Sequence, residues 1–315
     1  MISQDFWQTS FWNTCRKTRI VRLLGRIYRF SLKIKHLFLS KILCPYYAFR
    51  AKSFQIKNEP YDFGEVFVSL TSYPARIKES YYAICSLLVQ TQPANKIILT
   101  LTKEEFPKGE DSLPKEIIQL KNKGLEILWA DENLKPHNKY FYSMQKYPKA
   151  IIITADDDIL YPYKTIEKLL NSFKQHPHAV SGLCTDKLFF ENNNIKPYSQ
   201  AAYCYDVYVQ EPRFDLMIEG FAGALYPPSI LSKEAFNKEK IKQCAPIADD
   251  LWLKIMELLN HIPVVCAAKY QDPTMISSSQ ITALFKLNND LFENDRQLQK
   301  LIEEYKNRGI LDFFK

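Results

Sequence analysis

Runs of apolar residues in the middle of the chain alternate with segments of helical spacing. Five short runs rich in Ile, Leu and Val are bounded by polar or turn-forming residues, which is typical of strands buried on both faces. The segments between them place apolar residues three and four positions apart and close at Pro or Gly. The predicted strands are 66–70, 96–102, 125–130, 150–155 and 179–184. This alternation predicts an α/β fold with a mainly parallel sheet flanked by helices.

The N-terminal segment has a different pattern. From Arg16 to Lys52 there are eleven Lys or Arg residues and no Asp or Glu. At about 100° per residue, a helix over this stretch separates an apolar side from a basic side. The apolar side holds Ile20, Leu24, Ile27, Ile34, Phe38 and Ile42, and the basic side holds Arg22, Arg26, Arg29 and Lys33. We therefore expect a basic amphipathic helical arm over residues 1–60.

Two interpretations of this arm remain open. It is either a helix lying on an anionic membrane surface, with Phe6, Trp7, Phe11 and Trp12 also in the interface, or a helix packed on the main domain with a solvated basic face. Its apolar run is shorter than the ~20 residues needed to span a bilayer, and the charges within it disfavour a signal peptide. No nucleic-acid-binding motif accompanies the charge. The lack of acids favours the membrane surface.

Composition narrows the class of protein further. Of the net charge of +7, residues 1–60 contribute twelve Lys or Arg against two Asp or Glu, and the other 255 residues contribute thirty against thirty-three. The 46% hydrophobic fraction is that of a folded globular protein. The seven cysteines are odd in number and include no C-x-x-C pair, so neither a disulfide framework nor a zinc site is favoured. We expect a cytoplasmic protein, peripheral on the inner face of the cell membrane, without a nucleic-acid partner.

Three consecutive aspartates follow the fourth predicted strand, in IIITADDDILYP (151–162). Adjacent carboxylates repel one another and resist dehydration, so a protein keeps Asp156, Asp157 and Asp158 together only with compensation. Carboxylate oxygens suit Mg²⁺ or Mn²⁺, which proteins hold with one or two carboxylates plus substrate phosphates. The cluster thus predicts a metal site and a diphosphate-bearing substrate. The alternative is one helix-capping aspartate with two solvated neighbours.

Four segments in this order resemble a glycosyltransferase of the GT-A type, close to bacterial family-2-like enzymes of capsule or lipopolysaccharide synthesis. They are VSLTSYPARI, ITADDDILYP, EGFAGALYPP (219–228) and PIADDLWLK (246–254), within a resemblance that covers about residues 64–275. The resemblance implies a Rossmann-like GT-A fold and a hexosyltransferase. Its substrates would be a nucleotide-diphosphate sugar, a UDP-sugar first of all, and a glycan or lipid-linked glycan acceptor.

On the donor side, the resemblance assigns roles to the aspartates and to two neighbouring loops. Asp158 resembles the metal ligand that bridges to the diphosphate, and Asp156 resembles the residue that faces the ribose and completes the D-x-D; Asp157 between them is assigned to the donor as well. Thr71 and Arg76 match positions that usually contact the nucleotide. Lys139 is expected to reach the base or phosphates, with a solvated lysine as the alternative.

On the acceptor side, the resemblance implies a general base. Asp250 matches the base of inverting members, and Asp249 is expected to support it or contact the acceptor. The alternative is that the two acids only cap the N-terminus of the helix that follows. Gly220 and Gly223 are expected in a loop beside the acceptor sugar, although the family is usually richer in glycine here. Trp252 is a candidate for stacking on a sugar, with core packing as its alternative. Four of the five histidines, His137, His176, His178 and His261, match no metal position, and we expect structural roles for them.

These observations combine into one functional hypothesis. The basic arm (1–60), a catalytic domain (61–285) and a C-terminal helix (286–315) would form a metal-dependent, inverting glycosyltransferase of surface-polysaccharide synthesis. One rival is a sugar nucleotidyltransferase, which needs a glycine-rich basic first loop that TSYPARI lacks. The other is a membrane-associated, non-catalytic scaffold with a degenerate sugar site.

Overall fold

The computed structural model describes residues 19–191, 194–204, 206–276 and 292–314, and the side chains of residues 19–30, 32, 33 and 314 are set aside. The aromatic residues at 6–12 that sequence analysis assigned to the membrane interface, and the start of the predicted C-terminal segment, lie outside the described part.

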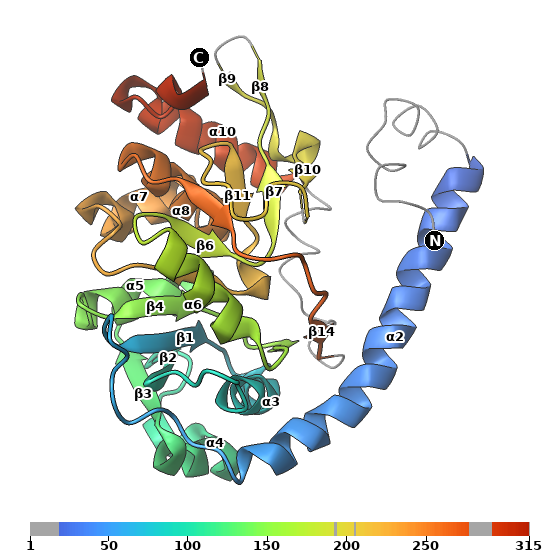
Figure 1. Ribbon diagram of the computed structural model, residues 1–315, viewed down its shortest axis with the longest axis vertical. Coiled ribbons are helices and arrows are strands. Elements are labelled where there is room, and N and C mark those ends of the chain that lie inside the picture. Colours follow the sequence, from blue (N-terminus) through green and yellow to red (C-terminus); the bar gives the residue numbers. More distant parts are fainter. Residues whose placement is uncertain (1–18, 192–193, 205, 277–291, 315) are drawn as a thin grey trace.

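A seven-stranded sheet forms the centre of the fold, in the order β13-β6-β12-β4-β1-β2-β3 (Figure 1). All neighbours are parallel except β12, which runs antiparallel to both β4 and β6. The predicted α/β class with a mainly parallel sheet flanked by helices is therefore confirmed. The strands are β1 (Val66–Thr71), β2 (Lys96–Thr102), β3 (Leu125–Ala130), β4 (Ile151–Thr154), β6 (Val180–Gly182), β12 (Ala224–Tyr226) and β13 (Val264–Cys266).

Helices cover both faces of this sheet because its strands are apolar on both sides. In β1, Val66, Val68 and Leu70 join one core and Phe67 joins another. The first core takes in α2 (Arg19–Ala51), α3 (Ile77–Leu88), α4 (Lys115–Gln119) and α6 (Thr165–Gln175). The opposite face is packed by α5 (Asn138–Lys146), α7 (Lys238–Cys244), α8 (Asp249–Leu259) and α10 (Glu293–Tyr305).

Three smaller sheets accompany the central one in the described part of the chain. β7 (Thr185–Lys187) lies between β10 (Ala202–Tyr203) and β11 (Leu216–Ile218), and β8 (Phe190–Glu191) pairs with β9 (Asn194–Ile195). A two-stranded sheet joins β5 (Ile159–Leu160), which directly follows the aspartates, to β14 (Thr274–Met275). The β5–β14 sheet therefore connects residues 274–275 to the segment that follows the aspartates.

The basic arm contains the long helix α2, which runs along one side of the body (Figure 1). Its C-terminal part packs against α3 and β14. Ser40, Cys44 and Tyr47 are buried on this inner side, while Ile34 and Phe38, from the predicted apolar side, are exposed. In the described part of the chain, no helix is both long and apolar enough to cross a membrane. The boundaries of the arm and of the C-terminal helix as separate units stay predictions.

Candidate active site

The loops after β1 and β4 meet at the carboxyl edge of the sheet, as expected for neighbouring parallel strands. We call Asp156–Asp158 the aspartate loop. Ser72 Oγ donates a hydrogen bond to Asp157 Oδ2 over 2.6 Å. Arg76 Nη1 lies 3.1 Å from Asp157 Oδ1 and 3.1 Å from Asp158 Oδ2. One buried guanidinium therefore compensates two of the three adjacent carboxylates.

Burial shapes the protonation of this loop. It raises the pKa of Asp157 to about 7, with a contribution from Asp158 and against the pull of Arg76 and Ser72. The pKa of Arg76 is itself raised, because the two carboxylates outweigh the effect of its burial. Sequence reasoning looked to a bound metal for compensation, whereas the protein already supplies a cation.

Lys139 connects the aspartate loop to the second acidic group of the sequence. Its Nζ lies 3.0 Å from Asp156 Oδ1 and 2.8 Å from Asp249 Oδ2, and the side chain is only 6% exposed. Burial alone would lower the pKa of Lys139, but Asp156, Asp249 and Asp250 raise it well above its ordinary value. The buried ammonium therefore stays charged and holds residues from three separate elements together. The solvated alternative for Lys139 is wrong.

Asp249 and Asp250, the acid pair, form the first turn of α8, and Ala248 rather than either acid is the capping residue. The Gly220 N–H donates to Asp250 Oδ2 over 3.1 Å. Burial and the charge of Asp249 raise the pKa of Asp250 well above its ordinary value. Burial also opposes the ionisation of Asp249, but Lys139 overrides it and lowers the pKa. Two neighbouring acids thus have pKa values pushed in opposite directions, a pattern typical of divided acid–base roles.

Gly220 owes its identity to this contact. A Cβ at this position would lie 2.6 Å from Asp250 Oδ1 and 3.2 Å from Lys139 Nζ, so any side chain here would displace the Asp250 carboxylate. Gly223 serves the backbone instead: its φ is +105°, and a Cβ there would meet Leu169 and Thr165 rather than the acid pair. Only the first of the two predicted glycines therefore lies against the acidic residues.

The predicted contact of Trp252 with a sugar does not fit the structure. The side chain of Trp252 is fully buried, and its indole N–H donates to the Ala235 carbonyl over 3.1 Å. It cannot stack on a sugar, because the apolar face of α8 carries it into the core. The Thr71 hydroxyl donates to the Thr100 carbonyl over 2.8 Å, across β1 and β2, and its contact with the nucleotide stays a prediction.

Several residues that sequence reasoning missed complete the site. The Tyr161 hydroxyl accepts a hydrogen bond from the Asp156 N–H over 2.7 Å and donates to the Phe221 carbonyl over 3.0 Å. It thereby links the aspartate loop to the Gly220 loop. Ser72 and Tyr161 both lie inside segments already singled out, so their nearness to the aspartates was a usable signal.

A second acid pair, made of buried Asp186 and partly buried Glu219, lies near Asp249 and Asp250. Asp186, on β7, and Glu219 share a hydrogen bond, and Tyr198 Oη donates to Glu219 Oε1 over 2.7 Å. Burial raises the pKa of Asp186 to about 6 and that of Glu219, with help from Asp186, to about 8. Glu219 precedes Gly220 in the sequence and could have been suspected, whereas nothing in the sequence around Asp186 marks it.

His137 illustrates the structural role expected of the histidines. It is completely buried, with Nδ1 3.0 Å from the Tyr140 hydroxyl and Nε2 2.7 Å from the Ala245 carbonyl. Burial lowers its pKa to about 4, so the ring is neutral at physiological pH. It braces α5 against the segment that leads into α8.

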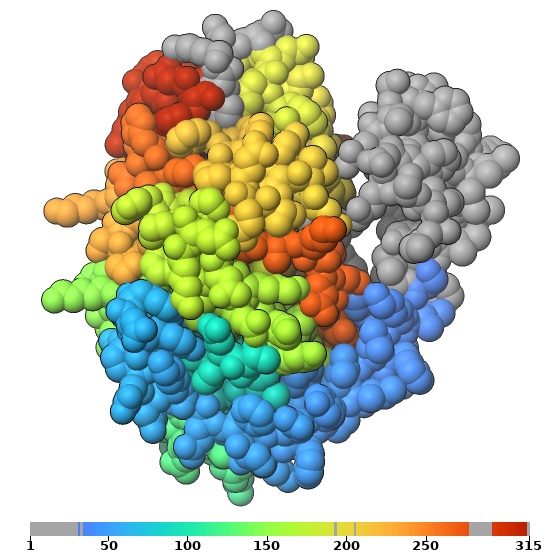
Figure 2. Space-filling view, in the orientation of Figure 1, coloured from blue at the N-terminus to red at the C-terminus, as the bar shows by residue number. Residues whose placement is uncertain are grey.

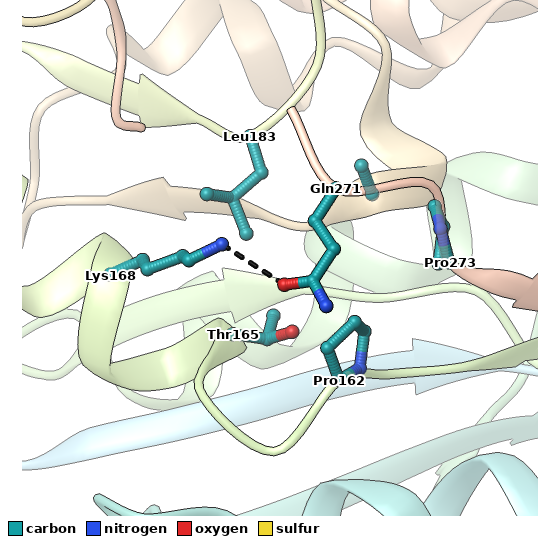
Figure 3. Close-up of a pocket in the computed structure, with 7 residues that line it drawn as sticks. Pro162, Thr165, Lys168, Leu183, Gln271 and Pro273 are labelled. Carbon is teal, nitrogen blue, oxygen red and sulfur yellow. Dashed lines mark hydrogen bonds between the residues drawn. The ribbon is translucent and has the colours of Figure 1, made fainter. Parts of the chain in front are cut away.

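A small cavity lies on the α6 side of Gly223, lined by Pro162, Thr165, Lys168, Leu183, Ala222, Gln271 and Pro273 (Figure 3). Lys168 Nζ donates to Gln271 Oε1 across it over 3.1 Å. Its volume of about 10 Å³ is that of a single water position. It is too small for a sugar or a nucleotide.

Asp156 and Asp158 suit a divalent cation in their donor chemistry. Among the described residues, no cluster of three or more His, Cys, Asp or Glu side chains could hold a metal by itself. Mg²⁺ and Mn²⁺ do not need such a cluster, since one or two carboxylates plus phosphate oxygens are sufficient. The Asp156 side chain is 31% exposed, and Asp158 lies two residues further along the same loop. The pair therefore fits a cation that arrives with a diphosphate, provided that Arg76 shares or releases Asp158.

Comparison with known proteins gives only distant likenesses. No family model matches the chain, and no curated protein matches it. A mannosyltransferase from Pyrobaculum calidifontis, in complex with GDP-Man and Mn²⁺, is 11% identical, with a TM-score of 0.41 over 75% of this chain and 65% of that one, so the chain spans less than two thirds of its length. S. aureus TarS 1–349 in complex with UDP is 14% identical, with a TM-score of 0.43 over 77% and 72%.

A synthetase is similar to the chain at the same level as the mannosyltransferase and TarS. CMP:2-keto-3-deoxy-manno-octonic acid synthetase, in complex with CTP, is 12% identical, with a TM-score of 0.41 over 73% of this chain and 99% of that one. At such scores the likenesses do not separate the two activities. The functional conclusion therefore depends on the residues of the site.

Proposed function

We propose that the protein is a metal-dependent glycosyltransferase that moves a sugar from a nucleotide-diphosphate sugar to a hydroxyl of a glycan acceptor, with inversion at the anomeric carbon. The observation that carries the proposal is the position of Lys139 between Asp156 and Asp249. The aspartate loop and the neighbour of the candidate base Asp250 then share one buried ammonium, so a donor diphosphate and an acceptor hydroxyl would lie next to each other.

The donor side of this site would bind the nucleotide diphosphate. Asp158 and Asp156 would hold Mn²⁺ or Mg²⁺, which when bound supplies Lewis-acid stabilisation of charge on a departing diphosphate. Arg76 is 3.1 Å from both Asp157 and Asp158, and in exchanging a carboxylate for a phosphate oxygen it would orient the same leaving group. A UDP-sugar is the first donor to test.

The acceptor side would handle the proton. Asp250, oriented by the Gly220 N–H, would accept the proton of the acceptor hydroxyl as its oxygen bonds to the anomeric carbon. The bond from that carbon to the diphosphate oxygen breaks with its electron pair going to the diphosphate. A raised pKa makes Asp250 a stronger base than an ordinary carboxylate, which favours proton removal at neutral pH. Asp249 would form the ion pair with Lys139, which leaves Asp250 without a paired cation that would lower its pKa.

The direct test measures nucleoside diphosphate released from a panel of UDP-, GDP- and CDP-sugars with Mn²⁺ or Mg²⁺. We expect one donor to be consumed and to raise the melting temperature with the metal present, because ligands of the native state stabilise it. EDTA should remove both effects. Pyrophosphate release from a nucleoside triphosphate and a sugar phosphate would establish the nucleotidyltransferase instead. No turnover and no stabilisation with any donor would favour the non-catalytic scaffold.

A substitution at the base sharpens this test. Asp250→Asn should lower kcat by about 10²–10⁴-fold, since general-base assistance is typically of that size. Its melting temperature should change little, because the amide oxygen of Asn can still accept the hydrogen bond from the Gly220 N–H. Asp131→Asn, at an acid whose side chain is 85% exposed, is the matched control and should leave kcat unchanged. Full activity in Asp250→Asn would place the base elsewhere or indicate a retaining mechanism.

A further inference from the structure

Helix α2 carries an unusual outward surface. Six of its large apolar side chains are exposed, and we call them the outer face of α2: Ile34, Leu37, Phe38, Ile42, Tyr46 and Phe49. Phe38 and Phe49 are 64% and 68% exposed. The other exposed large apolar residues of the described chain are scattered over separate elements. Contiguous apolar surface of this kind marks an interaction site.

The outer face is a property of the fold and not of a loose helix. The opposite side of the same helix is buried against the body, where Cys44 and Tyr47 join the main core. Lys35 Nζ pairs with Asp272 Oδ2 over 3.1 Å, and the Met275 N–H donates to His36 Nδ1 over 3.4 Å. These contacts fix the rotation of α2 about its axis. The exposed residues of the outer face therefore lie on the side of α2 opposite its buried residues. Figure 2 shows the described part of α2, in blue, at the edge of the molecule.

Charge identifies what this face meets. Between Arg16 and Lys52 the sequence has eleven Lys or Arg and no Asp or Glu, and the exposed residues Lys41 and Arg50 lie within the stretch of the outer face. The partner must therefore offer an apolar region for the exposed Ile, Leu and Phe side chains and negative charge for the Lys and Arg side chains. A second copy of the chain would place one basic helix against another and suffer repulsion. A nucleic acid offers the charge but gives no burial to aliphatic side chains. A bilayer surface with anionic headgroups supplies both.

We propose that the outer face of α2 docks on an anionic lipid surface. The apolar side chains enter the boundary between headgroups and acyl chains, and the Lys and Arg side chains of the same helix contact lipid phosphates. The helix lies along the surface, with the body attached through its inner side. This proposal does not depend on the sugar-transfer activity, because it uses no residue of the candidate active site.

Co-sedimentation of the full chain with vesicles tests the proposal. The protein should bind vesicles of phosphatidylcholine mixed with phosphatidylglycerol, bind pure phosphatidylcholine much less, and be released as the salt concentration rises. The double variant Phe38→Glu/Phe49→Glu should weaken binding by about tenfold or more, since two exposed phenyl rings lose their burial in the interface. Both positions are exposed, so circular dichroism and the melting temperature should match those of the unchanged chain.

A matched control separates this effect from added negative charge. Tyr203→Glu/Val207→Glu changes two residues that are 56% and 60% exposed but lie outside α2. It should bind anionic vesicles nearly as well as the unchanged chain. Equal losses in both double variants, or equal binding to neutral and anionic vesicles, would overturn the proposal. So would a dimer in sedimentation velocity that Phe38→Glu/Phe49→Glu dissociates while vesicle binding is absent.

Discussion

The aspartate loop and the acid pair are made of the same side chain but differ in how their charge is balanced. Arg76 reaches two carboxylates of the loop, whereas Lys139 reaches only Asp249 of the acid pair. Asp250 is left with a backbone N–H and a raised pKa. Burial raises the pKa of Asp157 even beside Arg76, so burial and the number of cations within reach together set how readily each of these carboxylates ionises.

Removing Lys139, the cation that the aspartate loop and the acid pair share, should have the largest effect on stability. Lys139→Met leaves Asp156 and Asp249 beside an apolar side chain, and losing one partner of a buried ion pair costs about 3–5 kcal/mol. Urea unfolding measures this loss. Lys103→Met, at an exposed pair with Asp131, is the control and should change stability by ~1 kcal/mol or less. Equal effects from the two variants would mean that Lys139 is solvated.

A methyl group at Gly220 should disturb Asp250 more than it disturbs the aspartate loop, because the new Cβ lies closer to Asp250 than to Lys139. In Gly220→Ala the new Cβ would lie 2.6 Å from Asp250 Oδ1, so the carboxylate must move. A displacement of that kind can lower kcat by up to about 10²-fold. Gly182→Ala introduces a comparable clash with Ile218 in the core. It should lower the melting temperature and leave the pH profile of the remaining activity as it was. An unchanged kcat in Gly220→Ala would separate Asp250 from catalysis.

The pH dependence of kcat/KM should distinguish the roles of Asp249 and Asp250. A general base works when deprotonated, so kcat/KM should fall as pH falls through the pKa of Asp250, which is raised above its ordinary value. Asp249→Asn removes a negative charge that raises this pKa, so the acidic limb should move to lower pH. A limb that stays in place, or moves to higher pH, would show that another group controls it.

The smallest expected effect concerns Trp252, two residues beyond the acid pair. Trp252→Phe removes the indole hydrogen bond to the Ala235 carbonyl and should lower the free energy of unfolding by about 0.5–1.5 kcal/mol. The KM for the acceptor should not change, because the ring lies in the core. A large rise in that KM with unchanged stability would restore the sugar-stacking role.

Much of the fold follows from local sequence. The β-branched run before Asp156 and the runs starting at Lys96 and Leu125 predicted strands that the structure contains nearly residue for residue. The antiparallel insertion of β12 between β4 and β6 could not be predicted, because Ala224–Tyr226 is short and its partners are distant in sequence.

The site was predictable in its residue types but not in its pairings. The aspartate loop and the acid pair each stand out in the sequence, whereas the ion pairs of Arg76 and Lys139 join residues from different loops of the sheet edge. Trp252 was misjudged because sequence does not show which side of α8 faces the core. Asp186 was missed because alternate positions of a three-residue strand give too little pattern.

The short strand β14 has a mechanical consequence. Its Met275 pairs with Ile159, directly after the aspartate loop, and the following Ile276 N–H donates to the Asp158 carbonyl over 2.8 Å. On the other edge of β14, the Met275 N–H donates a hydrogen bond to His36 Nδ1 of α2. Residues 274–276 thus connect α2 to the aspartate loop through hydrogen bonds of their backbone. Binding that restricts the motion of α2 would therefore also restrict the motion of the aspartate carboxylates.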